Sequence, residues 1–77
     1  AFGGNEIAAL AAYNAGPGYL KGLMAKHPQD WQKRLYPETR LYIHRVKAAE
    51  ILVANRMPLS QNNIDHVVKQ LEDGGLL

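Results

Sequence analysis

Asn14 is the polar residue with the clearest potential for chemistry in this sequence. It follows Tyr13 and stands directly before Ala15 and Gly16, at the end of an expected helix. A side-chain amide removed from water must find hydrogen-bond partners, or it costs about 1–3 kcal/mol. Two interpretations stay open: Asn14 satisfies backbone groups at the helix end, which periodicity alone favours, or its amide faces a polar ligand at the rim of a cleft.

Aromatic side chains form the second candidate set. Their rings can pack against the apolar faces of sugars, but rings of this kind also fill small helical cores, and core is the simpler interpretation of each one taken singly. Tyr42 stands out because it falls on the expected inward stripe of the longest helix, where a buried phenol needs a partner. The set is Tyr13, Tyr19, Trp31, Tyr36 and Tyr42.

No carboxylate has the expected surroundings of a catalytic acid. A glycosidase general acid needs a raised pKa, which an apolar pocket usually provides. Glu6 and Glu38 instead fall in the first turns of expected helices, where the helix dipole stabilises the anion. Four further acidic residues are expected on solvated helix faces: Glu50, Asp65, Glu72 and Asp73.

The sequence offers little for metal or nucleophilic chemistry. Cys is absent, which excludes disulfides, thiolate zinc sites and cysteine nucleophiles. His27, His44 and His66 stand at no compelling metal-ligand spacing, so we expect imidazoles that are exposed or bonded locally. We therefore expect no metal site and no cofactor.

Basic residues gather in the middle of the chain, although the net charge of +2 is only mildly basic. Such a cluster can contact phosphates, but more often it is a solvated face or a counter-charge for an acidic partner. We expect no nucleic-acid partner. The basic cluster consists of Lys33, Arg34, Arg40, Arg45 and Lys47.

The elements that must position these residues are helices. Ala and Leu dominate the apolar residues, Thr39 is the only threonine, and no segment alternates apolar and polar residues as a strand does. We expect an all-α fold of four or five helices with short connections. The expected segments are 5–15, 19–26, a short turn over 30–35, a long helix from Pro37 to before Pro58, and a last helix from Ser60 to Gly74.

Residues with known terminal preferences support these limits. Asn5, Asp30 and Ser60 are expected N-caps, and Pro37 suits the first position of a helix. Gly16-Pro17-Gly18 is expected to end the first helix and Gly74-Gly75 the last.

Periodicity assigns an apolar face to each longer helix. Such faces in so short a chain predict burial against further polypeptide or against a second copy of the chain. The expected faces are Ile7, Leu10, Ala11 and Asn14 in the first helix, Tyr42, Val46, Ala49 and Val53 in the longest, and Ile64, Val67, Val68 and Leu71 in the last.

The length of 77 residues allows one small domain or a part of a larger one, with marginal stability of its own. No apolar run approaches the roughly 20 residues of a membrane-spanning helix. The sequence starts with Ala1 and shows no signal-peptide pattern, so we expect it to belong to a longer chain.

Two long strings together carry a family resemblance. The first is Phe2-Gly3-Gly4-Asn5 followed by Ala9-Leu10-Ala11-Ala12-Tyr13-Asn14-Ala15-Gly16-Pro17-Gly18; the second is Tyr36-Pro37-Glu38-Thr39-Arg40-Leu41-Tyr42-Ile43 followed by Arg45-Val46. They resemble the last two signature motifs of the soluble lytic transglycosylase family, whose catalytic domain is similar to goose-type lysozyme. The resemblance covers roughly residues 2 to 50. We expect residues 1–50 to be the C-terminal part of that catalytic domain and residues 51–77 to be a helical C-terminal extension.

The resemblance implies an activity on peptidoglycan in the periplasm, the cell envelope or the extracellular space. Enzymes of this family cleave the β-1,4 bond between N-acetylmuramic acid and N-acetylglucosamine without consuming water. A single glutamic acid protonates the leaving oxygen and then deprotonates the muramoyl C6 hydroxyl, which attacks its own anomeric carbon and leaves a 1,6-anhydro end. This use of one carboxyl group differs from the two-carboxylate template of most glycosidases.

The resemblance also implies roles for individual residues. It places Tyr42 beside the catalytic glutamate, as a supporting residue. That glutamate, which precedes a serine, and a Gly-Leu-Met-Gln motif lie upstream of both strings in the family, so this chain alone is expected to be inactive. The other implied roles are substrate binding by the cleft-wall residues Tyr13, Asn14, Ala15 and Gly16, together with Tyr42, and shaping of the helix start by Glu38, Thr39 and Arg40.

Two readings of function therefore stay open. The first is a part of a lytic transglycosylase that supplies one wall of the glycan site. The alternative is a non-catalytic helical module that binds glycan or an acidic partner. Tyr19 departs from the family pattern, which has a small or basic residue there, and this difference is expected to alter a sugar subsite.

Overall fold

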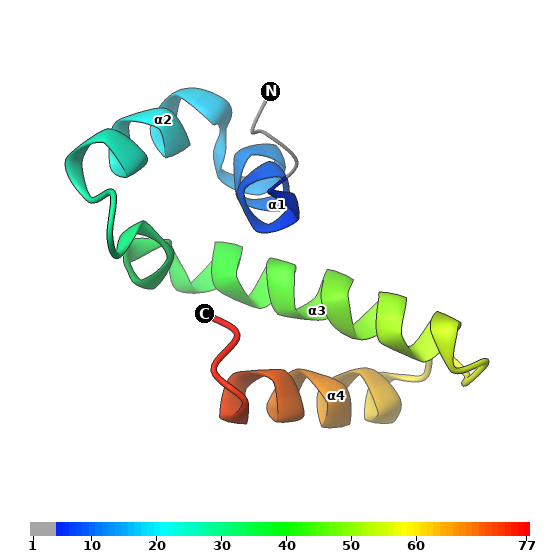
Figure 1. Ribbon diagram of the computed structural model, residues 1–77. Coiled ribbons are helices and arrows are strands. Elements are labelled where there is room, and N and C mark those ends of the chain that lie inside the picture. Colours follow the sequence, from blue (N-terminus) through cyan, green and yellow to red (C-terminus); the bar gives the residue numbers. More distant parts are fainter. Residues whose placement is uncertain (1–4) are drawn as a thin grey trace. The chain divides into compact units, whose positions relative to one another are not determined.

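The computed structural model describes residues 5–77, and every regular element in this range is helical (Figure 1). The prediction of an all-α fold is therefore confirmed. The motif residues Phe2, Gly3 and Gly4 lie outside the described residues. In chain order the elements are α1 (Glu6–Ala15), α2 (Pro17–Lys26), the short 3-10 helix η1 (Trp31–Arg34), α3 (Pro37–Ala54) and α4 (Gln61–Asp73).

The chain divides into two compact units, Ala1–Ile43 and His44–Leu77, which we call unit 1 and unit 2. The division falls within α3, so this helix contributes its first residues to unit 1 and its remaining residues to unit 2. These units are defined by packing alone. The expected boundary after residue 50 separates the part that resembles the catalytic domain from the C-terminal extension, so it stays a prediction.

Local capping sets the two ends of α1. The Asn5 side-chain oxygen accepts a hydrogen bond of 3.1 Å from the Ala8 N–H, which confirms Asn5 as the N-cap. At the other end the Gly16 N–H donates to the Ala12 carbonyl at 2.9 Å. Gly16 has φ +99°, a value that side chains with a Cβ rarely adopt, and this explains why the helix ends at a glycine.

The structure corrects two expected limits in unit 1. Helix α2 starts at Pro17 rather than at Tyr19, because proline at the first position needs no N–H partner and already has a helical φ. The Asp30 side chain does not cap η1. Its carboxylate instead accepts a hydrogen bond of 3.0 Å from Arg34 Nε.

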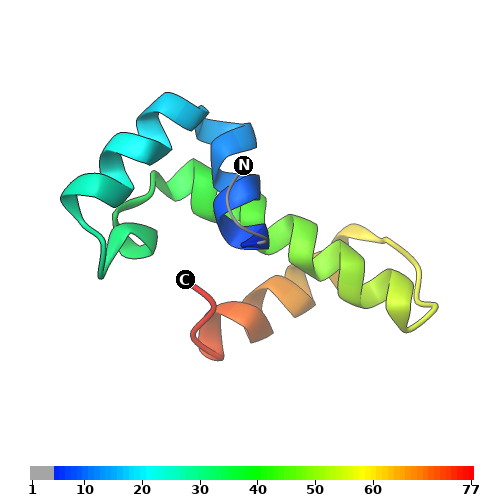
Figure 2. The ribbon, with the colours of Figure 1, turned by 45° about the horizontal axis from the view of Figure 1, so that its top comes forward.

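Small residues allow α1 and α2 to pack closely in unit 1 (Figure 2). The buried face of α1 is Ala8, Ala11 and Ala12, so the predicted face was wrong in part, and Asn14 is exposed. Helix α2 buries Leu20. The core reading of Trp31 is confirmed, since that ring is buried, and the remaining buried side chains of unit 1 are Leu35, Thr39 and Ile43.

In unit 2 the α4 helix runs back along α3 (Figure 1). Val67 and Val68 of α4 pack in one cluster with Ala48 and Leu52 of α3. Ile64 and Leu71 flank this cluster, so the predicted face of α4 is confirmed.

The predicted face of α3 was wrong within unit 2. Val53 is 61% exposed, and the buried apolar residues are Ala48 and Leu52 instead. Helix α3 carries apolar residues on two sides, and periodicity cannot tell which side the returning α4 covers. The other side forms a shallow apolar groove lined by Val46, Ala49, Glu50, Val53 and Ala54.

A sharp turn ends α4 and brings the last residues back to α3. The Leu76 N–H donates to the Leu71 carbonyl at 3.0 Å, and the Gly75 N–H donates to the Glu72 carbonyl at 3.1 Å. This is the Schellman pattern, with Gly75 at φ +88°. The turn places the Leu76 carbonyl 2.6 Å from Nε2 of the buried His44 ring, so that nitrogen donates its proton there.

Gly75→Ala is expected to destabilise unit 2 by about 1–2 kcal/mol, because alanine is strained at a left-handed φ. Thermal unfolding by calorimetry measures this effect. Gly22→Ala is the matched control: Gly22 is helical and an added Cβ there meets nothing within 4 Å. It should raise stability by about 0.5–1 kcal/mol. Equal effects at the two glycines would contradict the role assigned to the turn.

None of the helices within residues 5–77 is long and apolar enough to cross a membrane.

Candidate functional site

One hydrogen bond joins the two sequence strings. Thr39 Oγ1, near the start of α3, donates to Asn14 Oδ1, at the end of α1, over 2.9 Å. Thr39 is only 1% exposed, so its hydroxyl has little access to water and depends on this contact. The Asn14 side chain therefore bonds to a distant residue rather than to the backbone of its own helix end.

The Thr39 contact also fixes how Asn14 presents its amide. The oxygen accepts from Thr39, while the exposed side chain retains two N–H donors on Nδ2. A ligand that meets Asn14 is therefore recognised through an acceptor oxygen, such as the carbonyl of an amide.

Two aromatic rings lie next to this hydrogen bond. Tyr13, the neighbour of Asn14, stacks on Tyr42 of α3 with ring centroids 6.3 Å apart and planes inclined by 17°. Tyr13 is 83% exposed and Tyr42 is half-buried. The expected deep burial of Tyr42 was therefore wrong, and its ring contact is another tyrosine. The pair presents an aromatic surface to solvent beside the Asn14 amide.

The remaining motif residues lie at or near the ends of the same two helices. Ala15 and Gly16 are half-buried and form the end of α1. Glu38 lies in the first turn of α3 and is exposed to solvent. Arg40 is half-buried one residue after Thr39. Thus Tyr13, Asn14, Thr39 and Tyr42 come together through side chains, whereas Ala15, Gly16 and Glu38 lie at the ends of the two helices that carry them.

The structure contains a second pair of stacked rings, which the sequence did not predict. Tyr19 of α2 and Tyr36, just before α3, have ring centroids 4.7 Å apart and planes inclined by 12°. Burial raises the pKa of the Tyr19 phenol, and the charge and hydrogen bond of the neighbouring Tyr36 raise it further. Both residues were recognised as aromatic, but no periodicity links positions on two different elements.

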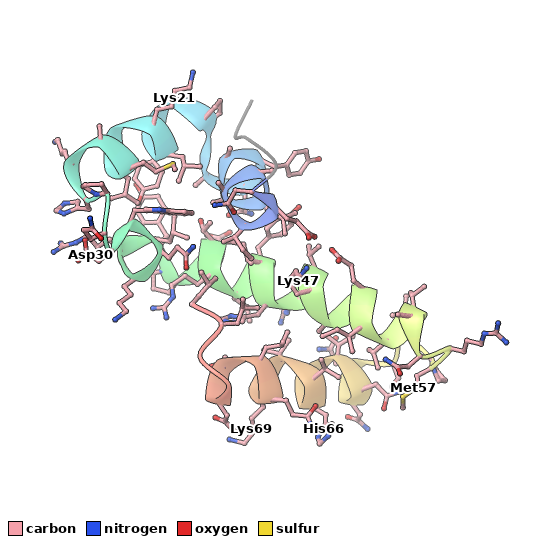
Figure 3. All side chains as sticks on the ribbon, in the orientation of Figure 1. Lys21, Asp30, Lys47, Met57, His66 and Lys69 are labelled. Carbon is pink, nitrogen blue, oxygen red and sulfur yellow. The ribbon has the colours of Figure 1, made fainter. Side chains whose placement is uncertain are left out.

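Arg34 and Lys47 of the basic cluster each lie close to a carboxylate. Arg34 Nε lies 3.0 Å from Asp30 Oδ2, and Lys47 Nζ lies 3.4 Å from Glu50 Oε2. Asp30 and Lys47 are labelled in Figure 3. Both are exposed pairs that contribute little to stability, but they reduce the positive charge available to an acidic partner.

One of the three histidines, His44, differs from expectation in its burial and in its hydrogen-bond partner. His44 was expected to be exposed or bonded locally, yet it is 4% exposed and bonded to Leu76, because the turn after α4 returns the chain to α3. His27 Nδ1 lies 3.9 Å from Asp30 Oδ1. Within residues 5–77 no three or more His, Asp or Glu side chains gather in a way that would hold a metal ion.

The candidate site is therefore the group Tyr13, Asn14, Thr39 and Tyr42 in unit 1: an aromatic pair, of which Tyr13 is exposed, beside an oriented amide. No family model, no curated protein and no solved structure matches this chain.

Proposed function

We propose that this chain supplies part of the glycan-binding wall of a peptidoglycan lytic transglycosylase. The observation that carries the proposal is the contact between the two motif strings, made by the Thr39–Asn14 hydrogen bond and the Tyr13–Tyr42 stack. Those strings were singled out from the sequence for their resemblance to that family, and their named site residues are neighbours in the fold.

The chemistry of the candidate site suits an N-acetylated sugar. The apolar face of a pyranose ring can lie on the exposed Tyr13 ring, and the acetamido carbonyl can accept from Asn14 Nδ2. Peptidoglycan carries an acetamido group on every sugar of its glycan strand. An aromatic surface beside an amide donor is the minimum set needed to recognise such a unit.

The catalytic carboxyl group of the proposed enzyme comes from a segment outside these 77 residues. Glu6 and Glu38 both lie in first helical turns and are exposed to solvent, whereas a glycosidase general acid usually lies in an apolar pocket. In the proposed reaction an external glutamic acid protonates the leaving oxygen, then takes the proton of the C6 hydroxyl as its oxygen bonds to C1. The proposed location is the periplasm or cell envelope.

The first test is binding. The 15N-labelled chain is titrated with a tetrasaccharide of alternating N-acetylglucosamine and N-acetylmuramic acid, and with cellotetraose, which lacks acetamido groups. We expect shifts at Tyr13, Asn14 and Thr39 with the first ligand and much weaker shifts with cellotetraose. Equal responses to both ligands, or shifts confined to unit 2, would argue against the proposal.

The second test is turnover, and the chain alone is expected to release no 1,6-anhydro sugars from peptidoglycan. A longer polypeptide that adds an upstream helix with the Glu-Ser pair is expected to release them. Chromatography of the soluble products measures both results. Binding without products from any longer chain would favour the alternative of a non-catalytic glycan-binding module.

A further inference from the structure

A second groove lies on α2, away from the Asn14 site. It has a volume of about 380 Å³. The lining residues form two rows along the helix: Gly18, Gly22 and Lys26 in the first, and Tyr19, Leu23 and His27 in the second. Members of each row are four residues apart, so each row follows one face of the helix. From Gly18 to Lys26 the groove runs for about 12 Å along the helix.

The two glycines form a floor that packing within the chain does not explain. A Cβ at Gly18 or Gly22 would meet nothing within 4 Å, and neither glycine has a positive φ. Glycine in a helix interior is less favourable than alanine, so Gly22 gives up helix stability without an internal packing gain. What the two glycines do provide is close access to the α2 backbone from outside.

One end of the groove has an aromatic wall that is held in place. The Tyr19 ring stacks on the Tyr36 ring, with centroids 4.7 Å apart and planes inclined by 12°. Because the ring of Tyr19 is fixed by this contact before any ligand arrives, little conformational entropy is lost when a ligand packs on it.

The other end of the groove is cationic. Lys26 forms no ion pair within the part of the chain that the structure describes. His27 lies beside it, with Nδ1 toward Asp30 at 3.9 Å, which leaves Nε2 for a ligand hydroxyl. Asp30 is the acidic group nearest to this end, and it is already bonded to Arg34.

We propose that this groove is a second glycan site, specific for a sugar that carries a carboxylate. The pyranose ring packs on Tyr19 over the glycine floor, and the carboxylate pairs with Lys26. This inference rests on the proposed glycan-binding function and adds a subsite for acidic units of the strand. The carboxylate can come from a lactyl ether, as in muramic acid, or from a uronic acid.

Gly22→Gln is the decisive variant, because it fills the groove while improving the helix. Glutamine is a better helix former than glycine, so the melting temperature should rise by about 3–6 °C. Affinity at the groove for the alternating tetrasaccharide should fall at least about tenfold, read from the backbone shifts of Lys26 and His27. Loss of binding therefore cannot be attributed to loss of fold.

Two variants that each remove one positive charge test whether the ligand carboxylate pairs with Lys26. Lys26→Gln removes the cation of the groove, and Lys21→Gln removes an exposed cation of α2 that does not line it (Figure 3). Only Lys26→Gln should weaken the alternating tetrasaccharide, by about 3- to 10-fold, and neither should change the weak binding of uncharged chitotetraose. A parallel titration with trigalacturonate shows whether a uronic acid binds the groove as tightly as a lactyl ether does.

The outcomes separate the two proposals. If the unchanged chain shows no ligand-induced shift at Lys26, the second site is overturned. If shifts at Asn14 also persist in Gly22→Gln, the proposed function still stands. Equal affinity for chitotetraose and the acidic tetrasaccharide at the groove would overturn its carboxylate specificity. No response at either site would overturn both proposals.

Discussion

Asn14→Ala is expected to lower the free energy of unfolding by about 1–3 kcal/mol, although Asn14 itself is exposed. The cost arises at the other end of its hydrogen bond. Thr39 is 1% exposed, and alanine at position 14 leaves the Thr39 hydroxyl without its acceptor in a place that water reaches poorly. In a chain of this size such a loss is a large part of the total stability.

The control for this prediction is the partner substitution. Thr39→Val removes the buried hydroxyl but leaves Asn14 Oδ1 at the surface, where water replaces the lost bond. It should therefore cost less than Asn14→Ala, and the double variant should cost less than the sum of the two. Urea titrations give the three free energies. Additive costs would show that the Thr39–Asn14 bond does not carry the effect.

Tyr13→Ala is expected to weaken binding of the alternating tetrasaccharide by about 30- to 100-fold, the range for removal of a central aromatic contact. Tyr13 is 83% exposed, so its removal should change stability by no more than about 0.5 kcal/mol. Affinity and stability are therefore expected to separate, which is the signature of a binding residue rather than a core residue. The ligand-induced shifts of the Asn14 and Thr39 backbone amides measure the affinity at this site separately from that of the α2 groove.

Tyr13→Phe is the matched control because it keeps the ring and its stack on Tyr42. It should remain within about threefold of the unchanged chain if the contact is made by the ring face. A loss as large as that of Tyr13→Ala would instead assign the contact to the hydroxyl. Unchanged affinity in Tyr13→Ala would remove Tyr13 from the site.

Most helix ends could be predicted because they depend on neighbouring residues, but the start of α2 at Pro17 and the missing cap from Asp30 could not. Asn5 and Ser60 cap through N–H groups three residues away, and Gly16 and Gly75 occupy left-handed turns that favour glycine. The face of α4 was also predictable, since that helix has one apolar stripe. In α3 two apolar sides compete, and only the position of α4 decides that Leu52 is buried and Val53 exposed.

The candidate site was predictable in its members and not in its contacts. The motif strings contain Tyr13, Asn14, Thr39 and Tyr42, but spacing along the sequence cannot show that Thr39 donates to Asn14. The Tyr19–Tyr36 stack and the bond from His44 to Leu76 were missed for the same reason. Each joins residues on separate elements, and local propensity says nothing about how two elements approach each other.

The division of the chain at Ile43 has a consequence for optical spectroscopy. Every aromatic residue belongs to unit 1, and unit 2 has none; the set is Phe2, Tyr13, Tyr19, Trp31, Tyr36 and Tyr42. Fluorescence of the buried Trp31 therefore reports on unit 1 alone, whereas peptide absorption arises from both units. Comparing the two signals in a single melt measures directly whether the units share one unfolding transition, with no label attached to the protein.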